Sequence, residues 1–208
     1  MEINNISIKN DGYVYCKSNF YSAQDFLNSD FIYNFSKGIN KLCGEIDSGT
    51  WAISYLISMY KYRPKDFVLF EPPKITINDN SFNLNDFFEY TCYMDKIYPL
   101  FANNSTVEKL IVKGLKHSKS EYSTEEIKRL FKLDNERFKR SLNGTGNEVF
   151  KAMAAIGFAY GKEVFCFPWF SNMRFKNYHK NITDLLDVLS NLNKIVILPL
   201  GVDKLENH

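Results

Sequence analysis

A strand, a helix and a second strand at the carboxyl end of the chain constrain the fold more than any other feature of the sequence. A strand is expected at 163–167, where apolar residues follow Glu163, a capped helix at 181–192, and a second strand at 194–198, where apolar residues follow Lys194. Two strands joined by a helix in this way lie parallel in one sheet, and the connection between them is right-handed. The sequence therefore predicts an α/β fold that contains a parallel sheet.

The first hundred residues favour strands. Alternating apolar residues predict a hairpin that joins residues 3–8 to 13–15 across 10–12, and apolar runs predict further strands at 31–35, 68–70, 75–77 and 90–93. From residue 105 the apolar period becomes helical, with helices expected at 106–117, after a capping box at 123–126, and at 147–159. No repeat or long linker interrupts the 208 residues. We therefore expect a single domain over residues 1–208, with a helical insertion over about 97–160.

Composition excludes several classes of function. A formal net charge of +2 provides no large basic field, so we expect no nucleic-acid partner. Apolar runs have strand length, not the roughly 18 residues of a membrane-spanning helix, and the start of the chain has no secretory signal pattern. These features predict a cytoplasmic protein. The four cysteines, Cys16, Cys43, Cys92 and Cys166, are irregularly spaced, which favours free thiols over disulfides or a metal site.

A glycine loop stands where an α/β sheet can bind phosphate. It follows the apolar pair at 42–43 and precedes a helical run at 52–60, which is the strand, loop and helix order of a phosphate-binding loop. Such a loop continues with Gly-Lys-Ser/Thr, whereas this chain has Thr50 in the lysine position and Trp51 in the hydroxyl position. A tight turn without a ligand is the alternative. The candidate nucleotide-binding residues are Gly44, Asp47, Ser48, Gly49, Thr50 and Trp51.

A second glycine-rich loop opens the helix that leads to the apolar strand at 164–167. Its residues are Leu142, Asn143, Gly144, Thr145 and Gly146. Taken with the first loop and the helix start at 105–107, this order resembles the nucleotide-binding domain of ABC transporters. The first three residues match the start of the family's Leu-Ser-Gly-Gly-Gln signature loop, and the last two match it loosely. An ordinary glycine-rich helix cap is the alternative for this loop.

The resemblance covers nearly the whole chain and implies a particular architecture. It implies a P-loop NTPase-like ABC ATPase domain with an N-terminal antiparallel β-subdomain, a parallel core sheet and a helical subdomain. It also implies that ATP is the cofactor and that magnesium accompanies it. Loss of the phosphate-loop lysine weakens ATP binding by about ten- to a hundredfold, and we expect magnesium binding to suffer more.

The sequence departs from the family at the positions that carry hydrolysis. In ABC proteins the apolar strand ends in an aspartate that positions magnesium and a glutamate that polarises water, and here Pro168 and Trp169 stand there. The glutamine-loop position falls near Asp95, and the position of the family's histidine after the last strand falls near Pro199 and Leu200, where no histidine stands. The resemblance thus implies a pseudo-ATPase with weak or no nucleotide binding. Tyr13 and Tyr15 are the candidates for stacking on adenine, with ordinary strand tyrosines as the alternative.

The resemblance also implies protein partners, because ABC domains pair head to tail and couple to membrane permeases. The partner is a second copy of this chain or a competent ABC subunit that receives the loop at 142–146, and the protein is then peripheral at the inner face of the membrane through its partner. The candidate docking surface is aromatic and comprises Tyr90, Tyr93, Tyr98 and Phe101. The alternative is that these rings belong to the core.

Three functions remain open from the sequence. The first is a degraded ABC subunit that acts by dimerising or docking, which predicts a two-lobed fold and little hydrolysis. The second is an ATPase that uses non-standard residues such as Asp47 or Asp95. The third is a soluble scaffold outside the ABC family whose glycine loops are ordinary turns.

Overall fold

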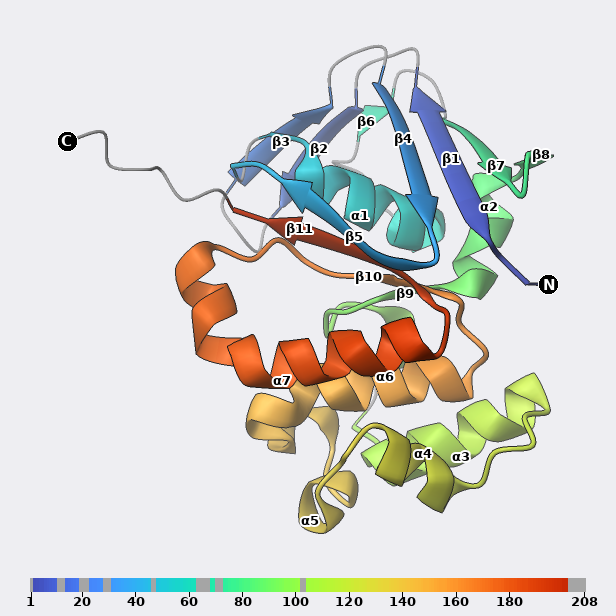
Figure 1. Ribbon diagram of the computed structural model, residues 1–208, viewed down its shortest axis with the longest axis vertical. Coiled ribbons are helices and arrows are strands. Elements are labelled where there is room, and N and C mark those ends of the chain that lie inside the picture. The colour runs from blue at the N-terminus through green and yellow to red at the C-terminus, as the bar shows by residue number, and fades with distance from the viewer. Residues whose placement is uncertain are drawn as a thin grey trace.

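The computed structural model describes residues 2–10, 14–18, 23–27, 31–45, 48–62, 68–69, 73–101 and 104–201. Antiparallel strands lie at one end, followed by helix α1 (Thr50–Met59), the parallel sheet, and helices α6 (Val149–Ala159) and α7 (Asn172–Asn191) (Figure 1). The parallel sheet thus lies between α1 on one face and α6 and α7 on the other. This architecture confirms the predicted α/β class with an antiparallel part, a parallel core sheet and a helical part.

The parallel sheet has the strand order β5, β11, β10, β9. These strands are β5 (Gly38–Cys43), β11 (Ile195–Leu200), β10 (Val164–Cys166) and β9 (Thr91–Tyr93), and all three pairings are parallel. Helices cover both faces, so the central strands β10 and β11 must be apolar; β10 is buried at every position and β11 at every position but its last. The parallel pair predicted at the carboxyl end is confirmed. Its connecting helix α7 begins at Asn172, nine residues earlier than expected.

The antiparallel strands form two further sheets. One has the order β4 (Phe31–Ser36), β1 (Asn5–Asn10), β7 (Lys74–Ile77) and β8 (Asn80–Phe82), and the other has the order β3 (Ala23–Leu27), β2 (Val14–Ser18) and β6 (Val68–Leu69). The predicted hairpin between the first two strands is wrong, because β1 pairs with β4 and β7 whereas β2 pairs with β3 and β6. Buried Ile6 lies opposite Phe35 and Ile77 in this register. Apolar partners far along the chain therefore decide the pairing.

The helices between residues 105 and 160 gather at the opposite end of the molecule from the antiparallel strands (Figure 1). They comprise α3 (Val107–Ser118), α4 (Thr124–Leu130), α5 (Asn135–Phe138) and α6, while the short α2 (Leu84–Phe87) lies near β8. The Thr106 side chain accepts a hydrogen bond from the Lys109 amide at the start of α3. The predicted capping box at the start of α4 is confirmed, with Ser123 and Glu126 bonding each other's backbone amides.

The aromatic stretch proposed from the sequence as a docking surface is core. Tyr93, Tyr98 and Phe101 are buried, and Tyr90 is partly buried against the same core. The Tyr98 hydroxyl donates a hydrogen bond to the Thr91 carbonyl, which satisfies its polar end. These rings therefore hold the segment after β9 in place and do not offer a surface to a partner.

The described cysteines are free thiols. Cys92 and Cys166 lie on neighbouring parallel strands, one residue out of register, and are fully buried, whereas Cys43 is exposed. Burial raises the pKa of the Cys92 thiol to about 12. No cluster of three or more metal-binding side chains occurs among the residues that the structure describes. None of the described helices is both long and apolar enough to cross a bilayer.

Candidate functional site

The carboxyl ends of the four parallel strands carry most of the residues that the sequence singles out. The strand β5 leads into Gly44, β11 into Gly201, β10 into the pair Pro168 and Trp169, and β9 into Asp95. Ligands of open α/β sheets bind at this edge, outside the carboxyl ends of the strands. The fold thus brings the first glycine loop and the 168–169 pair to one place.

The first glycine loop is folded back on itself. Gly49 has a φ of 88° and caps the start of α1, a left-handed conformation that favours glycine. A Cβ on Gly44 would lie 2.1 Å from the Ser48 Oγ, so the two ends of the loop touch. The Ser48 amide and hydroxyl both donate to the Glu45 carbonyl, at 3.0 and 2.6 Å. The Gly44 amide donates to the Leu200 carbonyl at 2.9 Å, and the candidate Asp47 lies outside the described residues.

Trp51 points into the protein interior from the first turn of α1. Its side chain is 2% exposed, and its ring lies edge-on to Tyr55 at 6.3 Å. Tyr55 in turn lies edge-on to Tyr93 at 5.3 Å, which extends the aromatic contact to the end of β9. Ser54 fixes the same helix to the chain after β10 by donating to the Phe167 carbonyl at 2.6 Å. The hydroxyl position of a phosphate loop is therefore occupied by a buried indole.

Trp169 covers the same loop from the other side. Its Nε1–H donates to the Gly44 carbonyl at 3.0 Å, and its side chain is partly buried. A Cβ on Gly201 would lie 3.0 Å from the Trp169 ring, so the indole lies against the chain that leaves β11 as well. Pro168 beside it is buried. The residue in the position of the water-polarising glutamate thus packs on the backbone of the first glycine loop.

Among the residues that the structure describes, those in the lysine, hydroxyl and carboxylate positions do not fit a magnesium nucleotide. Magnesium binds carboxylate, hydroxyl and phosphate oxygens, and a phosphate loop holds phosphate with inward-facing amides and a lysine. Pro168 and Trp51 bring no oxygen ligand, and Thr50, in the lysine position, is buried with its Oγ1 3.4 Å from the Ser48 Oγ. Two amides of the loop, those of Gly44 and Ser48, already donate to carbonyls of the chain.

The second glycine loop has an anchored and an exposed part. It forms two short 3-10 turns, Leu142–Gly144 and Gly146–Glu148, that lead directly into α6. Leu142 and Thr145 are buried, and the Thr145 hydroxyl donates to the Leu142 carbonyl at 2.7 Å. Asn143, Gly144 and Gly146 are exposed. The loop therefore presents backbone and one amide side chain to the outside from a fixed base.

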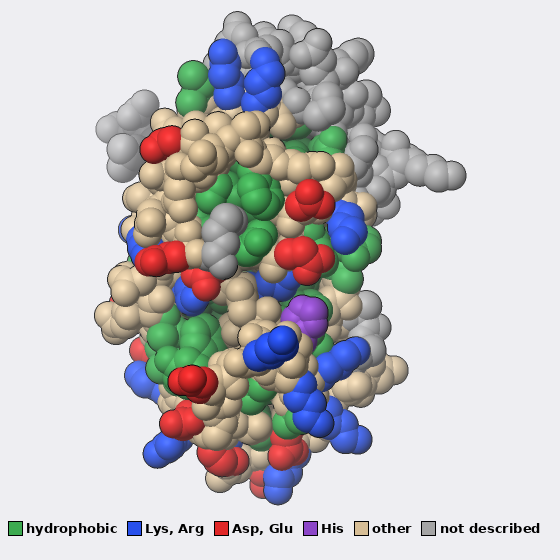
Figure 2. Space-filling model, turned by 90° about the vertical axis from the view of Figure 1, so that its right-hand side faces the viewer, with side chains coloured by type: hydrophobic (Ala, Val, Ile, Leu, Met, Phe, Trp, Pro, Cys, Tyr) green, Lys and Arg blue, Asp and Glu red, His purple; other side chains and the backbone are tan. Residues whose placement is uncertain are grey.

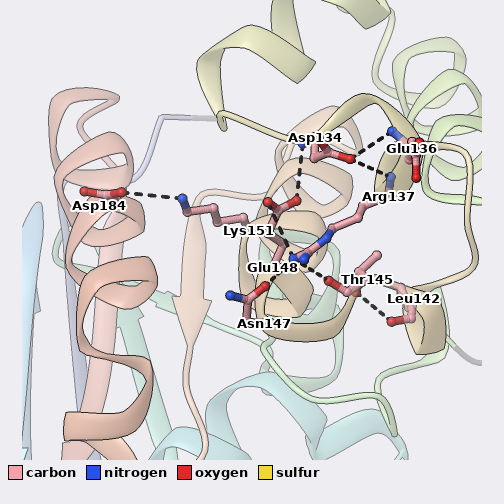
Figure 3. Close-up of polar contacts among 9 residues, drawn as sticks. All are labelled: Asp134, Glu136, Arg137, Leu142, Thr145, Asn147, Glu148, Lys151 and Asp184. Atoms are coloured by element: carbon pink, nitrogen blue, oxygen red, sulfur yellow. Dashed lines mark hydrogen bonds and ion pairs between the residues drawn. The ribbon is translucent and has the colours of Figure 1, made fainter.

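Arg137 holds this loop from α5 (Figure 3). Its Nη1 donates to the Thr145 carbonyl at 3.3 Å and to the Asn147 side chain, and it lies 3.7 Å from the Glu148 carboxylate. Glu148 also accepts a hydrogen bond from the Asp134 amide at 3.2 Å. Hydrogen bonds from the amides of Arg137 and Glu136 lower the pKa of the Asp134 carboxyl, which caps α5. The network fixes the loop relative to the helix before it.

A cavity of about 410 Å³ separates the second loop from the glutamine-loop position. Asp95 and Lys96 line one side, Asn143 and Gly146 line the other, and apolar residues form the rest. The other lining residues are Met94, Leu142, Val149, Phe150, Met153 and Tyr178. The fold thus places Asp95 opposite the second loop, with two strands of the sheet between its strand and the strand that leads into the first loop.

Two features of the site have no signal in the sequence. Arg137 lies ten residues before Asn147, and no motif marks it as a partner of the loop. The bond from the Trp169 indole to Gly44 joins residues 125 positions apart. The adenine-stacking candidates stay untested, because Tyr13 and the side chain of Tyr15 lie outside the described residues.

Comparison with solved structures establishes the fold. An ATP-bound bacterial Atm1-family ABC exporter matches 99% of this chain with a TM-score of 0.59 and 12% identity. The chain has the fold of an ABC ATPase domain. The ATP-binding cassette MJ0796, in a dimeric post-hydrolysis state with ADP and Pi, matches 95% of the chain with a TM-score of 0.59 and 10% identity. An ABC transporter ATP-binding protein from Pyrococcus furiosus matches 97% with a TM-score of 0.60 and 13% identity.

The extent of these matches differs between the solved proteins. This chain spans 36% of the exporter chain, 88% of the MJ0796 chain and 94% of the Pyrococcus furiosus chain. No protein-family model and no curated protein matches the sequence. Because the identities are only 10–13%, the structural similarity establishes the ABC ATPase fold and nothing beyond it.

Proposed function

We propose that this chain is a degenerate ABC-type subunit that does not hydrolyse ATP and acts by pairing with, or docking on, an ABC assembly. The observation that carries the proposal is that tryptophans stand at two positions on which nucleotide chemistry depends in the family. Trp51 is buried in the first turn of α1, and the Trp169 indole donates to the Gly44 carbonyl at 3.0 Å. Nucleotide would meet a loop that the Trp169 indole contacts and whose hydroxyl position holds a buried indole instead of an oxygen ligand.

These tryptophans also oppose nucleotide binding energetically. Burial of a tryptophan contributes several kcal/mol to folding, because the side chain removes about 150–250 Å² from water. That stabilisation is lost when Trp51 leaves its place. Without a lysine in the loop and a carboxylate at 168–169, this chain lacks the family's ionic contacts with phosphate and magnesium that would compensate for the loss. We therefore expect ATP binding by this chain alone to be weak or absent.

The second glycine loop supports a role in a pair. Asn143, Gly144 and Gly146 are exposed, while the Arg137 and Glu148 contacts fix the backbone that carries them. A rigid, exposed loop loses little conformational entropy on binding. In the head-to-tail pairing that the resemblance implies, this loop faces the nucleotide held by the other subunit. The proposed partner is therefore an ABC subunit with a complete phosphate loop.

The cavity beside Asp95 replaces the buried aromatic stretch as the proposed docking surface for the rest of the assembly. It has an apolar floor and polar groups at its rim, which is the composition expected of a recognition site. A permease segment that enters it would place this chain at the inner face of the membrane, as a cytoplasmic subunit bound through its partner.

A repaired phosphate loop tests the pairing. We expect the Thr50→Lys/Trp51→Ser variant to bind ATP and to dimerise in its presence, because the repaired loop of each copy then meets the 142–146 loop of the other. Light scattering after size exclusion measures the mass with and without ATP. Asn143→Arg added to this variant should restore the monomer, and Lys139→Arg is the matched control at another exposed position of the same region.

Two results would count against the proposal. The first is magnesium-dependent phosphate release by the unmodified chain, which would identify an ATPase with non-standard residues. The second is a repaired variant that binds ATP and stays monomeric, since the 142–146 loop would then have no role in pairing. A repaired variant that unfolds is recognised by its circular dichroism. In that case single Thr50→Lys chains, which keep both tryptophans, are compared with the parent for ATP binding.

A further inference from the structure

Helix α3 carries a basic ridge on the face opposite its buried side. The ridge consists of Lys109, Lys113 and Lys116, which are spaced four and three residues apart and are all exposed. Residues with this spacing lie one above the other on a helix. The opposite side buries Val107, Leu110, Ile111 and Gly114. Figure 2 shows one face of the molecule, with Lys and Arg side chains gathered around a histidine in its lower half.

The charges of the ridge are not neutralised by neighbouring carboxylates. Among the described residues, no Asp or Glu oxygen lies within 4 Å of the ammonium group of Lys109, Lys113 or Lys116. On the neighbouring helix, by contrast, Lys128 pairs with Glu125 at 3.1 Å. His117 and Lys119, both exposed, extend the basic surface beyond the end of α3, and Glu108 and Glu121 flank it at its two ends. The centre of the surface is therefore positive.

The shape of the ridge selects the kind of partner. From residue 109 to residue 116 the helix rises about 10 Å, so the three ammonium groups form a short straight row on a convex surface. Interfaces between proteins have an apolar centre. Among the described residues, the large hydrophobic side chains exposed near the row are Val112 and Tyr122, and these two do not make such a centre. A flat array of anions can meet all three lysines without such a centre. Anionic lipid headgroups at a bilayer surface form such an array.

We propose that the α3 ridge binds an anionic bilayer surface directly. The row of ammonium groups approaches the headgroups, with the exposed Val112 side chain beside it, and the buried face of α3 stays packed on α6. This contact is independent of the phosphate loop and of the 142–146 loop. It goes beyond the proposed function, because the chain would bind membranes without a permease.

Vesicle sedimentation tests the proposal with the full chain. The probes are vesicles of phosphatidylcholine alone and vesicles of phosphatidylcholine mixed with phosphatidylglycerol, at low and high salt. We expect binding to the anionic vesicles alone, and weaker binding at high salt because mobile ions screen the charges. Each lysine near an anionic surface contributes about fivefold to the partition coefficient, so Lys109→Gln/Lys113→Gln/Lys116→Gln should reduce it about 100-fold.

A second triple variant controls for the loss of charge. Lys41→Gln/Lys176→Gln/Lys180→Gln removes the same three charges from exposed positions on β5 and α7, and it should bind the anionic vesicles nearly as well as the parent. Glutamine is a good helix former, so the α3 variant should keep its circular dichroism spectrum.

Three outcomes would overturn the proposal. One is no sedimentation with either kind of vesicle, and another is equal sedimentation with both. The third is equal loss of binding in the two triple variants, which would mean that the net charge of the protein, and not the α3 ridge, determines vesicle binding. Soluble polyglutamate competes in a parallel assay. If it binds the ridge as tightly as the vesicles do at the same concentration of negative charge, the partner is an acidic protein and the lipid assignment is wrong.

Discussion

Replacement of Trp51 by alanine tests whether this side chain is part of the core beneath the first glycine loop. Trp51 is 2% exposed and lies edge-on to Tyr55. A tryptophan removes about 200 Å² from water, and at about 25 cal/mol per Å² its burial is worth about 5 kcal/mol. Core tryptophan-to-alanine changes cost about 3–5 kcal/mol, which agrees with this value. We expect the variant to lose about 3–5 kcal/mol of unfolding free energy.

Urea denaturation followed by circular dichroism measures this loss. For a chain of this size each kcal/mol corresponds to about 2–4 °C in melting temperature, so a decrease of roughly 6–20 °C should accompany it. Ile32→Ala is the control, because Ile32 is 59% exposed and the change should cost less than about 1 kcal/mol. A loss below about 1 kcal/mol for Trp51→Ala would refute the reasoning, since the indole would then lie outside the core.

Three further predictions concern the supports of the site. Gly157→Val should cost about 1–3 kcal/mol in urea denaturation, because a Cβ there would lie 2.8 Å from the Cys92 Sγ and 3.1 Å from the Phe165 ring; an unchanged midpoint would place α6 farther from the sheet. Ser123→Ala should cost about 1 kcal/mol by removing the capping box with Glu126, and an equal loss in a variant that already lacks Glu126 would contradict the reciprocal bonding. Burial raises the pKa of Cys92 from about 9 to about 12, so the folded chain keeps a thiol proton that the unfolded chain loses in this window. The stability due to this thiol is full below pH 9 and falls by about 1.4 kcal/mol per pH unit as the pH rises toward 12. Denaturation at each pH should show a shallower fall in unfolding free energy for Cys92→Ala than for the parent. Identical profiles for the two proteins would contradict the burial of Cys92.

The sequence predicts the parallel sheet well because its signals are local. The apolar strands at the carboxyl end and the helix between them follow from periodicity and length, and β10 and β11 pair in parallel as predicted. The predicted capping box at Ser123 depends on residues three apart and is also confirmed. Such features are determined within one turn or one strand of the chain.

The pairing of the antiparallel strands was not predictable in the same way. Residues 3–8 and 13–15 have the alternation of a hairpin, yet Ile6 pairs with Phe35 and Ile77, which are distant in sequence. Alternation fixes which side chains face the core but not which strand lies alongside.

The structure of the candidate site was foreseeable only in part. Trp51 stands in the loop itself, so its effect on the phosphate position can be expected from the sequence. The bond from Trp169 to Gly44 and the contacts from Arg137 to the second loop join separate elements, and they follow from the tertiary packing. Side-chain contacts between segments this far apart leave no periodic pattern in one sequence.

Calorimetric titration of the unmodified chain with ATP, with and without magnesium, tests the central claim most directly when phosphate release is measured in the same samples. A chain that carries Trp51 and Trp169 should show weak binding or none up to millimolar ATP, and no phosphate release above the buffer blank. The Thr50→Lys/Trp51→Ser variant provides the positive control for a repaired loop. Magnesium-dependent phosphate release that disappears in Gly49→Asp would contradict the account, because it would show that the loop binds and turns over nucleotide as it stands.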